Sequence, residues 1–509
     1  MADKIDDGWR LVDKAYELIR QMLTFDQQRD APVIRFEQPE KLKKGFCLHK
    51  RYALTAGIVG HIASDITGNL RPSGGRHPNF KNQLYGGVDP YGLAASFIIE
   101  ALNTNLHTYE VAPVFVLTEM EVIAMIKSAI DLPNSEGTFC AGGSIANMYG
   151  LSIARHYYDS STKQQGLFGR KRMIIFTSDQ AHYSVKKAAV FMGFGTDSVV
   201  TVRCNRNGSM NIAALKERIA EVSSQSDVGI FQNLRKAHYD ALQRRPFCVW
   251  CTSGTTVLNG YDSLDEIATI CEHYGLWMHV DACLGGAALL SPKYRHLMNG
   301  YERCDSLTWN WHKTMGSPIQ TSLFLTKHKD LLKSCHSQHA SYLFPEVRLY
   351  DTKFDVGDSS IQCSRKPDAF KIWLMWKAYG LEGLKALVEK AFENAEYLAE
   401  RLRANRNFKL VNNSNNGCSV CFWFIPSRLD GIPEDDFFWQ EVGKVPSFRP
   451  LLALKLKMVT TGKAMVAVQK LPDQNLVDFF RVTFTCHPSM KFEEVDMLID
   501  TIARSGQEL

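Results

Sequence analysis

The sequence predicts an α/β fold followed by a second, smaller α+β domain, and three observations support this. From about residue 93 to 250, helical patterns alternate with short apolar runs. Such alternation indicates parallel βαβ units with helices on both faces of a sheet. Strand patterns then return, each followed by a polar or glycine-bearing turn, at 247–251, 276–280, 306–309 and 322–325. After about residue 366 the pattern changes to long amphipathic helices with separate strands.

The individual elements follow from hydrophobic periodicity. Residues 8–29 carry apolar side chains at helical spacing, including Trp9, Val12 and Ile19, and predict a leading amphipathic helix. The same reasoning predicts further helices at 145–154, 184–192, 368–378, 381–403 and 492–504, and strands at 173–176, 198–202, 419–425 and 479–485. The polar, basic stretch 224–246 interrupts this order, and we expect a surface helix or loop extension there.

These elements suggest three parts of the chain: an N-terminal helical segment at 1–92, a large domain at 93–365 and a small C-terminal α+β domain at 366–509. A chain of 509 residues with 45% hydrophobic and 22% charged residues is ordinary for a globular protein with a large core. No internal repeat or low-complexity tract is present.

The charge pattern favours a small-molecule partner. The formal net charge is only +5 and there is no long lysine or arginine block, so we expect neither nucleic acid nor an anionic membrane as a partner. The N-terminal residues are polar, and no stretch is apolar over the length of a membrane span. A cytoplasmic protein is therefore expected.

Two cysteine pairs have the CxxC spacing of a zinc site, Cys248 with Cys251 and Cys418 with Cys421. Both pairs lie within apolar strand patterns, without glycine knuckles, and are too far apart in sequence for a zinc ribbon. Cysteine packs well as a small hydrophobic residue, so we expect buried thiols and no metal.

The most informative residues are an aspartate and a lysine that each follow an apolar segment. Asp281 closes the segment 276–281, and Lys313 ends the run 305–313. Either residue alone is more often a solvated turn residue. Together they match what pyridoxal phosphate requires, because a lysine forms the Schiff base and a carboxylate keeps the pyridine nitrogen protonated.

A glycine turn supplies a candidate phosphate site. Gly143 and Ser144 open the helical segment at 145–154, where unpaired backbone N–H groups and the helix dipole favour an anion. Such a turn alone is more often a plain helix start. Thr256, after the strand at 247–251, and Asn310, before Lys313, add a hydroxyl and an amide to the same candidate site.

Two histidines complete the constellation. His182 follows the strand at 173–176, at the strand end where ligands collect in open α/β sheets, and its imidazole can stack on a pyridine ring. On its own it is more often a histidine that bonds a loop carbonyl. His312 immediately precedes Lys313 and can position groups or relay protons around it.

The sequence resembles the group II pyridoxal-phosphate decarboxylases from about residue 50 to the C-terminus. The resemblance is carried by His182-Tyr183-Ser184, Thr252-Ser253-Gly254-Thr255-Thr256, His279-Val280-Asp281-Ala282 and Asn310-Trp311-His312-Lys313. Further segments resemble the acidic amino acid branch of cysteine sulfinate, aspartate and glutamate decarboxylases: 82–84, 109–115, 340–344 and 373–378. Segments 337–344 and 361–370 are more similar to the cysteine sulfinate and acidic amino acid decarboxylase-like members than to glutamate decarboxylase.

The resemblance implies fold type I, with a mixed, mostly parallel seven-stranded sheet, and a homodimer in which residues 1–92 pack across the interface. It implies that Lys313 carries the cofactor, Asp281 contacts its ring nitrogen and His182 stacks on its ring. It implies phosphate contacts from Gly143, Ser144, Thr256 and Asn310.

The resemblance also implies a substrate pocket. Arg481 matches the arginine that pairs with the substrate α-carboxylate, a task suited to a bidentate guanidinium. Gln83 and Asn105 match pocket positions, and Tyr85 and His107 occupy positions where the branch members differ. Tyr350 aligns with the tyrosine of a mobile loop that reaches into the neighbouring subunit and donates a proton to the product carbon.

Three differences from the family pattern lie near these residues. Trp311 stands where proline is usual, and Leu284 stands where tryptophan is usual. The loop at 345–359 differs on both sides of Tyr350. The polar extension at 227–242 has no counterpart in the pattern.

Three hypotheses follow. The first is an α-decarboxylase of a small acidic amino acid, cysteine sulfinate or aspartate, with glutamate as a weaker candidate. The second keeps the cofactor with another outcome, such as aldehyde formation, transamination or desulfuration; the aldehyde-forming relatives typically carry phenylalanine in place of Tyr350. The third is a catalytically weakened paralogue kept for binding, suggested by Trp311 and Leu284 and opposed by the intact Lys313, Asp281 and His182.

Overall fold

The structure of the 509-residue chain is a computed structural model. It describes residues 77–226, 244–338, 340, 342–343, 350–412, 417–425, 450–471 and 476–507, together with four positions between 13 and 20. The helix expected at 8–29, apart from those positions, and the extension at 227–242 lie outside the described residues.

The chain divides into two compact units. The large unit comprises residues 89–393 and 414–419, and the small unit comprises residues 1–88, 394–413 and 420–509. The domain boundaries expected at residues 92 and 365 stay predictions.

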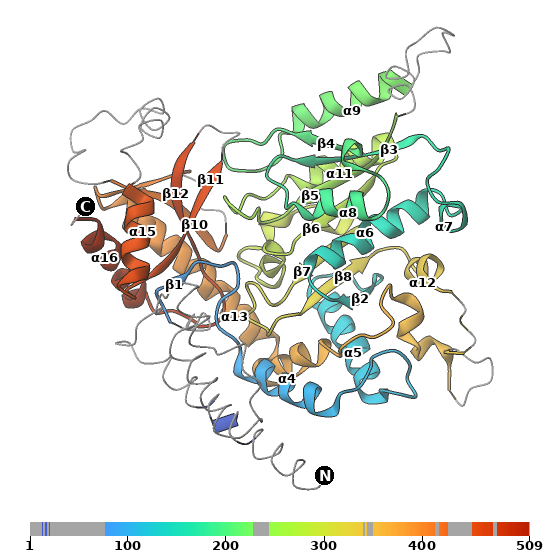
Figure 1. The fold of residues 1–509 in the computed structure, drawn as a ribbon, viewed down its shortest axis with the longest axis horizontal. Helices are drawn as coiled ribbons and strands as arrows, with labels where there is room; N and C mark the ends of the chain where they lie inside the picture. Colours follow the sequence, from blue (N-terminus) through green and yellow to red (C-terminus); the bar gives the residue numbers. More distant parts are fainter. Residues whose placement is uncertain are drawn as a thin grey trace, which may run out of the picture. The chain divides into compact units, whose positions relative to one another are not determined.

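The large unit is built on a mixed seven-stranded sheet (Figure 1) with the strand order β2-β8-β7-β6-β5-β3-β4. Its strands are β2 Glu136–Cys140, β3 Arg172–Ser178, β4 Val199–Val202, β5 Arg244–Thr252, β6 Trp277–Asp281, β7 Ser306–Asn310 and β8 Ser322–Thr326. Strand β8 runs in the opposite direction to the other six, so its pairings with β2 and β7 are antiparallel and the remaining pairings are parallel. The expected α/β fold with a mostly parallel seven-stranded sheet is confirmed.

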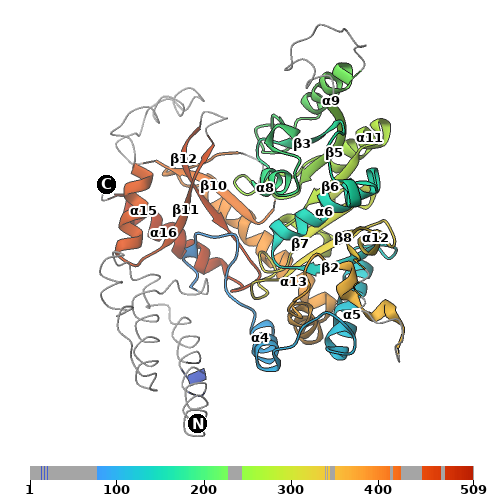
Figure 2. The same ribbon diagram turned by 45° about the vertical axis from the view of Figure 1, so that its right-hand side comes forward.

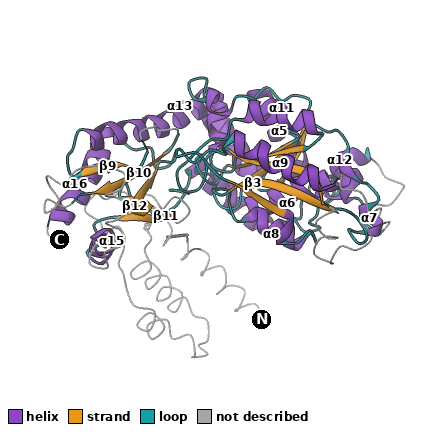
Figure 3. Cartoon of the chain, turned by 90° about the horizontal axis from the view of Figure 1, so that it is seen from above, coloured by secondary structure: helices purple, strands orange, loops and turns teal. Residues whose placement is uncertain are grey.

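Helices lie on both faces of this sheet (Figure 3). The described α-helices of the large unit, besides part of α13, are α4 Pro90–Leu102, α5 Pro113–Ala129, α6 Gly143–Tyr158, α7 Thr162–Gln165, α8 Ser184–Phe191, α9 Ile212–Ser226, α11 Leu264–Tyr274 and α12 Leu331–His336. Helix α6 lies against β6, β7 and β8 (Figure 2), and buried residues such as Tyr149 and Trp250 form the core between helices and sheet. The all-buried strands β6 and β7 have apolar runs because both of their faces are covered.

The small unit contains a five-stranded sheet with the order β1-β11-β12-β10-β9. Its strands are β1 Phe80–Lys81, β9 Phe408–Leu410, β10 Ser419–Phe424, β11 Met465–Leu471 and β12 Leu476–Thr483, and its helices are α15 Pro450–Thr460 and α16 Phe492–Gln507. Strand β1, from early in the chain, pairs in parallel with β11.

Helix α13, Ala369–Arg403, belongs to both units, because the division falls at residues 393 and 394. It is interrupted at Gly380, which has φ 65° and ψ 176°. A positive φ is costly for residues other than glycine, so Gly380 separates two helical segments close to the expected pair at 368–378 and 381–403.

The four cysteines of the CxxC pairs are buried and form no disulfide, and within the described ranges no group of three or more His, Cys, Asp or Glu residues could hold a metal ion. In the same ranges, no helix has the length and apolarity that crossing a bilayer requires.

Three histidines of the large unit are largely buried, although charged side chains act on each of them. His279 is 1% exposed in the middle of β6, and burial lowers its pKa to about 4. Burial likewise lowers the pKa of His312, which follows β7, and of His336, at the end of α12, to about 4. All three imidazoles are therefore neutral in the folded protein near pH 7.

We predict that the protein loses stability as the pH falls from about 6.5 towards 4. The pKa of each histidine is lower in the folded protein than in the unfolded chain, so protonation of the histidines favours unfolding. The stabilisation from keeping these imidazoles neutral is complete above the unfolded pKa, and it is lost as the pH falls through the folded pKa. Each histidine contributes a slope of up to about 1.4 kcal/mol per pH unit in the free energy of unfolding. Urea denaturation at fixed protein concentration and a series of pH values measures the free energy of unfolding. The variant His336→Gln should reduce the slope of that free energy against pH by an amount that corresponds to the uptake of up to one proton. A flat profile in the wild type between pH 6 and 4.5 would contradict the prediction.

Candidate active site

The site residues predicted from the sequence cluster where parallel strands of the large sheet end. Asp281 is the last residue of β6 and Asn310 the last of β7. His182 follows the end of β3 by four residues, and Lys313 follows the end of β7 by three. Because parallel strands end at the same edge of a sheet, these side chains share that edge, which is where ligands bind in open α/β folds.

Asp281 is a buried carboxylate held in its ionised form. It is 4% exposed, and burial raises its pKa, but the Lys313 ammonium and hydrogen bonds from its neighbours outweigh burial and leave the pKa below the ordinary value. The Cys283 N–H donates to Oδ1 at 3.1 Å, and the Asn147 amide donates to Oδ2 at 2.7 Å. A buried, fixed negative charge is what a protonated ring nitrogen requires as a partner.

His182 lies within electrostatic reach of both Asp281 and Lys313. Burial lowers its pKa, although the Asp281 carboxylate opposes the shift. The backbone N–H of Ser184 donates to Nδ1 at 3.2 Å, which places the proton of the neutral ring on Nε2. His182 is thus a neutral, half-buried ring beside the charged pair.

The glycine turn and the end of β7 meet in a close contact. A Cβ atom at Gly143, the first residue of α6, would lie 2.6 Å from Asn310 Nδ2 and 2.7 Å from Cys283 Sγ. The position therefore requires glycine, and it brings the helix N-terminus to the amide predicted to serve the same phosphate. Ser144 follows as the second, half-buried residue of the helix.

The turn after β5 adds polar groups at the same strand ends. The buried hydroxyls of Thr252 and Ser253 make no hydrogen bond within the described part of the chain, and Thr256 is half-buried two residues beyond Gly254. Burying a polar group without a partner is unfavourable, so these hydroxyls suit a site completed by a polar ligand. The glycine-lined helix N-terminus, the buried carboxylate and the lysine fit pyridoxal phosphate.

The two unusual neighbours of the site are core residues. Trp311 is fully buried and packs on Trp309, with ring centroids 4.7 Å apart, and on Trp376 at 6.1 Å. Leu284 is 2% exposed, and its carbonyl accepts a hydrogen bond from Thr314 Oγ1 at 3.0 Å. Both side chains fill space within the large unit.

His312 is anchored by the backbone of Thr321. The Thr321 N–H donates to His312 Nδ1 at 3.1 Å. The imidazole is a neutral group beside the lysine, which fits a positioning task better than a charged one.

Sequence reasoning missed Asn147 and the role of His279. Asn147 bonds both Asp281 Oδ2 and His279, whose Nε2 lies 3.0 Å from Asn147 Oδ1. The sequence spacing could have predicted Asn147, because it lies four residues after Gly143 and so shares one face of α6 with that glycine.

The predicted substrate residues are divided between the units. In the large unit, Asn105 Oδ1 accepts the Arg365 N–H at 2.9 Å. His107 is 6% exposed and lines a cavity of about 770 Å³, together with Arg155 and His336. In the small unit, Gln83 is half-buried and Tyr85 is 43% exposed.

Arg481, also in the small unit, lies on β12 and is 4% exposed. Its Nη2 donates to the Asn82 carbonyl at 3.5 Å, so the guanidinium is next to the chain segment that bears Gln83.

Tyr350 lies beside a loop of the large unit. Its hydroxyl donates to Asp355 Oδ1 at 3.1 Å and accepts from the Glu110 N–H at 3.4 Å. Its ring is 5.1 Å from that of Tyr109. The hydroxyl proton is therefore held by a carboxylate.

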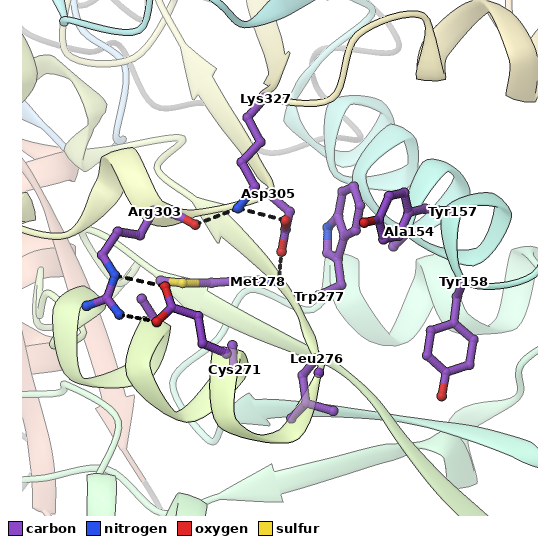
Figure 4. Close-up of a pocket in the computed structure, with 13 residues that line it drawn as sticks. Ala154, Tyr157, Tyr158, Cys271, Leu276, Trp277, Met278, Arg303, Asp305 and Lys327 are labelled. Carbon is purple, nitrogen blue, oxygen red and sulfur yellow. Dashed lines mark hydrogen bonds and ion pairs between the residues drawn. The ribbon is translucent and has the colours of Figure 1, made fainter.

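A second cavity, of about 310 Å³, lies at the opposite ends of the strands (Figure 4). Trp277, the first residue of β6, and Tyr157 form part of its wall. Its cations are paired, Arg303 with Glu272 at 2.7 Å and Lys327 with Asp305 at 2.9 Å. None of the predicted site residues lines it.

Comparison with known proteins shows the family of the chain. Residues 39–425 match the family described as "Pyridoxal-dependent decarboxylase conserved domain". The chain is 43% identical to the acidic amino acid decarboxylase GADL1 of Bos taurus, over 100% of this chain and 93% of that protein. It is 40% identical to human cysteine sulfinic acid decarboxylase, over 85% of this chain and 83% of the relative.

A solved structure confirms the fold. The crystal structure of mouse CSAD superposes with a TM-score of 0.88 and 34% identity, and the match covers 98% of each chain. The resemblance stated from the motifs, including its branch, is thereby confirmed. The chain belongs to the pyridoxal-dependent decarboxylase family, within its acidic amino acid branch, and is a pyridoxal phosphate-dependent amino acid decarboxylase.

Proposed function

We propose that the protein removes the α-carboxylate of a small acidic amino acid, cysteine sulfinate or aspartate, to give hypotaurine or β-alanine. The observation that carries this is the buried, ionised Asp281 beside Lys313 and His182, in a chain 43% identical to an acidic amino acid decarboxylase. Glutamate is the weaker candidate, because segments 337–344 and 361–370 are more similar to the cysteine sulfinate members.

Each site residue has a role in this proposal. When bound, pyridoxal phosphate supplies an electron sink for the bond that breaks. Lys313 Nζ would hold the cofactor through a covalent bond, Asp281 would keep a proton on its ring nitrogen, and His182 would contact its ring. The N–H groups at the start of α6, with Ser144, Thr256 and Asn310, hold the phosphate.

Arg481 is proposed to bind the substrate α-carboxylate. The support is its match to the family's arginine and the geometry of a guanidinium, whose N–H groups can donate to both oxygens of a carboxylate. Gln83, Tyr85, Asn105 and His107 are proposed to recognise the side-chain acid. Holding the scissile bond in one orientation is the contribution expected of such contacts.

Tyr350 is proposed as the proton donor to the product carbon, with His312 positioning Lys313. The loop bearing Tyr350 would serve the site of a second copy, so the active species is proposed to be a homodimer, located in the cytoplasm. The support is the alignment of Tyr350 with the family's loop tyrosine and the hydrogen bond that holds its proton.

The proposal predicts a substrate order. Release of carbon dioxide should be readily measured with cysteine sulfinate or aspartate, weaker with glutamate and undetectable with aromatic amino acids, because the pocket is proposed to hold a second acid. A radiometric or coupled assay over these substrates measures this. Preferential release from an aromatic amino acid would refute it.

The variant Lys313→Ala should lose the visible absorption band of the lysine-bound cofactor, because that band requires the covalent bond. Its decarboxylation should fall by at least about 10³-fold. Lys327→Ala, which changes a lysine at the opposite ends of the strands, is the matched control and should keep both. A full absorption band in Lys313→Ala would remove this lysine from the mechanism.

Tyr350→Phe should retain the cofactor band and slow carbon dioxide release by about 100-fold or more, the size expected for a lost general acid. Oxygen uptake with aldehyde formation should rise. The experiment compares both rates with those of Tyr157→Phe, which alters a tyrosine of the second cavity. Unchanged decarboxylation in Tyr350→Phe would exclude it as the donor.

A further inference from the structure

A continuous line of buried hydrogen bonds runs from the start of β6 to Asp281 at its end. Trp277 Nε1 donates to Ser306 Oγ at 3.0 Å, and Ser306 Oγ lies 2.8 Å from His279 Nδ1. His279 Nε2 lies 3.0 Å from Asn147 Oδ1. Asn147 Nδ2 donates to Asp281 Oδ2 at 2.7 Å. All five side chains are at most 4% exposed.

The chemistry of the two ends sets the direction of every bond. An ionised carboxylate only accepts, so the Asn147 amide nitrogen faces Asp281 and the amide oxygen faces His279. That oxygen also only accepts, so the proton of the neutral imidazole is on Nε2 and is donated to Asn147 Oδ1. His279 Nδ1 then accepts the proton of Ser306, and Ser306 Oγ accepts from the Trp277 indole N–H.

The packing around His279 favours this single arrangement. A Cβ atom at Gly150, on α6, would lie 2.5 Å from His279 Nδ1, so the helix leaves room for the imidazole only because glycine is there. Asn147 has a second amide hydrogen, and it is used by Ser184 Oγ at 3.1 Å. Every donor of Asn147 is thereby engaged.

We infer that Asn147 and His279 are positioning residues that hold the Asp281 carboxylate in one orientation and in its ionised form, so that the cofactor ring nitrogen stays protonated. The inference rests on the proposed function only in taking Asp281 as the partner of that nitrogen. Asn147 fixes Oδ2 and the Cys283 N–H fixes Oδ1, which leaves the remaining lone pairs of the carboxylate for the ring. Lys313, His182, His279 and the Cys283 thiol are the titratable groups that face or adjoin Asp281.

The test compares Asn147→Leu and His279→Leu with the conservative His279→Gln in the cofactor-loaded enzyme. The first readout is the pH titration of the absorption and fluorescence of the bound cofactor, and the second is the rate of cofactor release. Both leucine variants should shift the titration by about one pH unit or more and speed cofactor release by about 10-fold or more, the size expected when a buried supporting hydrogen bond is lost. They should lower kcat by about 10- to 100-fold with KM changed less than threefold.

His279→Gln keeps an amide donor near the position of Nε2 and should recover a large part of each readout. Asn394→Leu is the matched control: Asn394 is 2% exposed and donates to the Met490 carbonyl at 3.0 Å, but it belongs to the small unit. Asn394→Leu should change the denaturation midpoint of the protein and leave the pH titration of the bound cofactor unchanged.

Two results would overturn the inference. One is an Asn147→Leu enzyme whose cofactor titration, release rate and kcat match those of Asn394→Leu. The other is a His279→Gln enzyme as impaired as His279→Leu, since the hydrogen bond would then not be the cause. The cofactor readouts need no substrate, so failure of every proposed substrate would be recognised separately.

Discussion

The burial of one ionised carboxylate, Asp281, is the constraint on which the site depends. Removing a carboxylate from water costs on the order of several kcal/mol unless opposite charge and donors replace the lost hydration. Here the Lys313 ammonium, the Cys283 N–H and the Asn147 amide replace it. Because each donor comes from a different part of the large unit, the correct folding of that unit and the ionisation of Asp281 are coupled.

The parallel arrangement of the large sheet makes this coupling possible. Asp281 is paired in the sheet with Thr252 on one side and Thr308 on the other, so its backbone cannot move independently. Lys313 follows the neighbouring strand β7, and the turn after β5 approaches closely enough that a Cβ at Gly254 would lie 2.7 Å from the Gly285 nitrogen. Rigid strands thus hold groups that a flexible loop could not hold at fixed separation.

Helix α6 joins the proposed phosphate site to the support of Asp281. Gly143, Asn147 and Gly150 recur at helical spacing, and they face Asn310 at the end of β7, Asp281 at the end of β6 and His279 in the middle of β6. A side chain at either glycine would force the helix away from the sheet. Helix α6 can therefore lie close to the sheet because Gly143 and Gly150 have no side chain, and the hydrogen bond from Asn147 to Asp281 fixes its position between them.

Much of this protein follows from its sequence alone. Strands β3 to β8, β10 and β12, the two helical segments of α13 and the α/β class were predictable, because apolar periodicity and turn residues are local signals, whereas β1, β2, β9 and β11 were not predicted. The tertiary structure alone decided the hydrogen-bond line to Asp281 and the burial of Trp311. His279 and Asn147 are 132 residues apart in the chain, and their contact depends on the rotation of α6 over the sheet. That rotation is set by side-chain packing across the large unit, which no local pattern encodes.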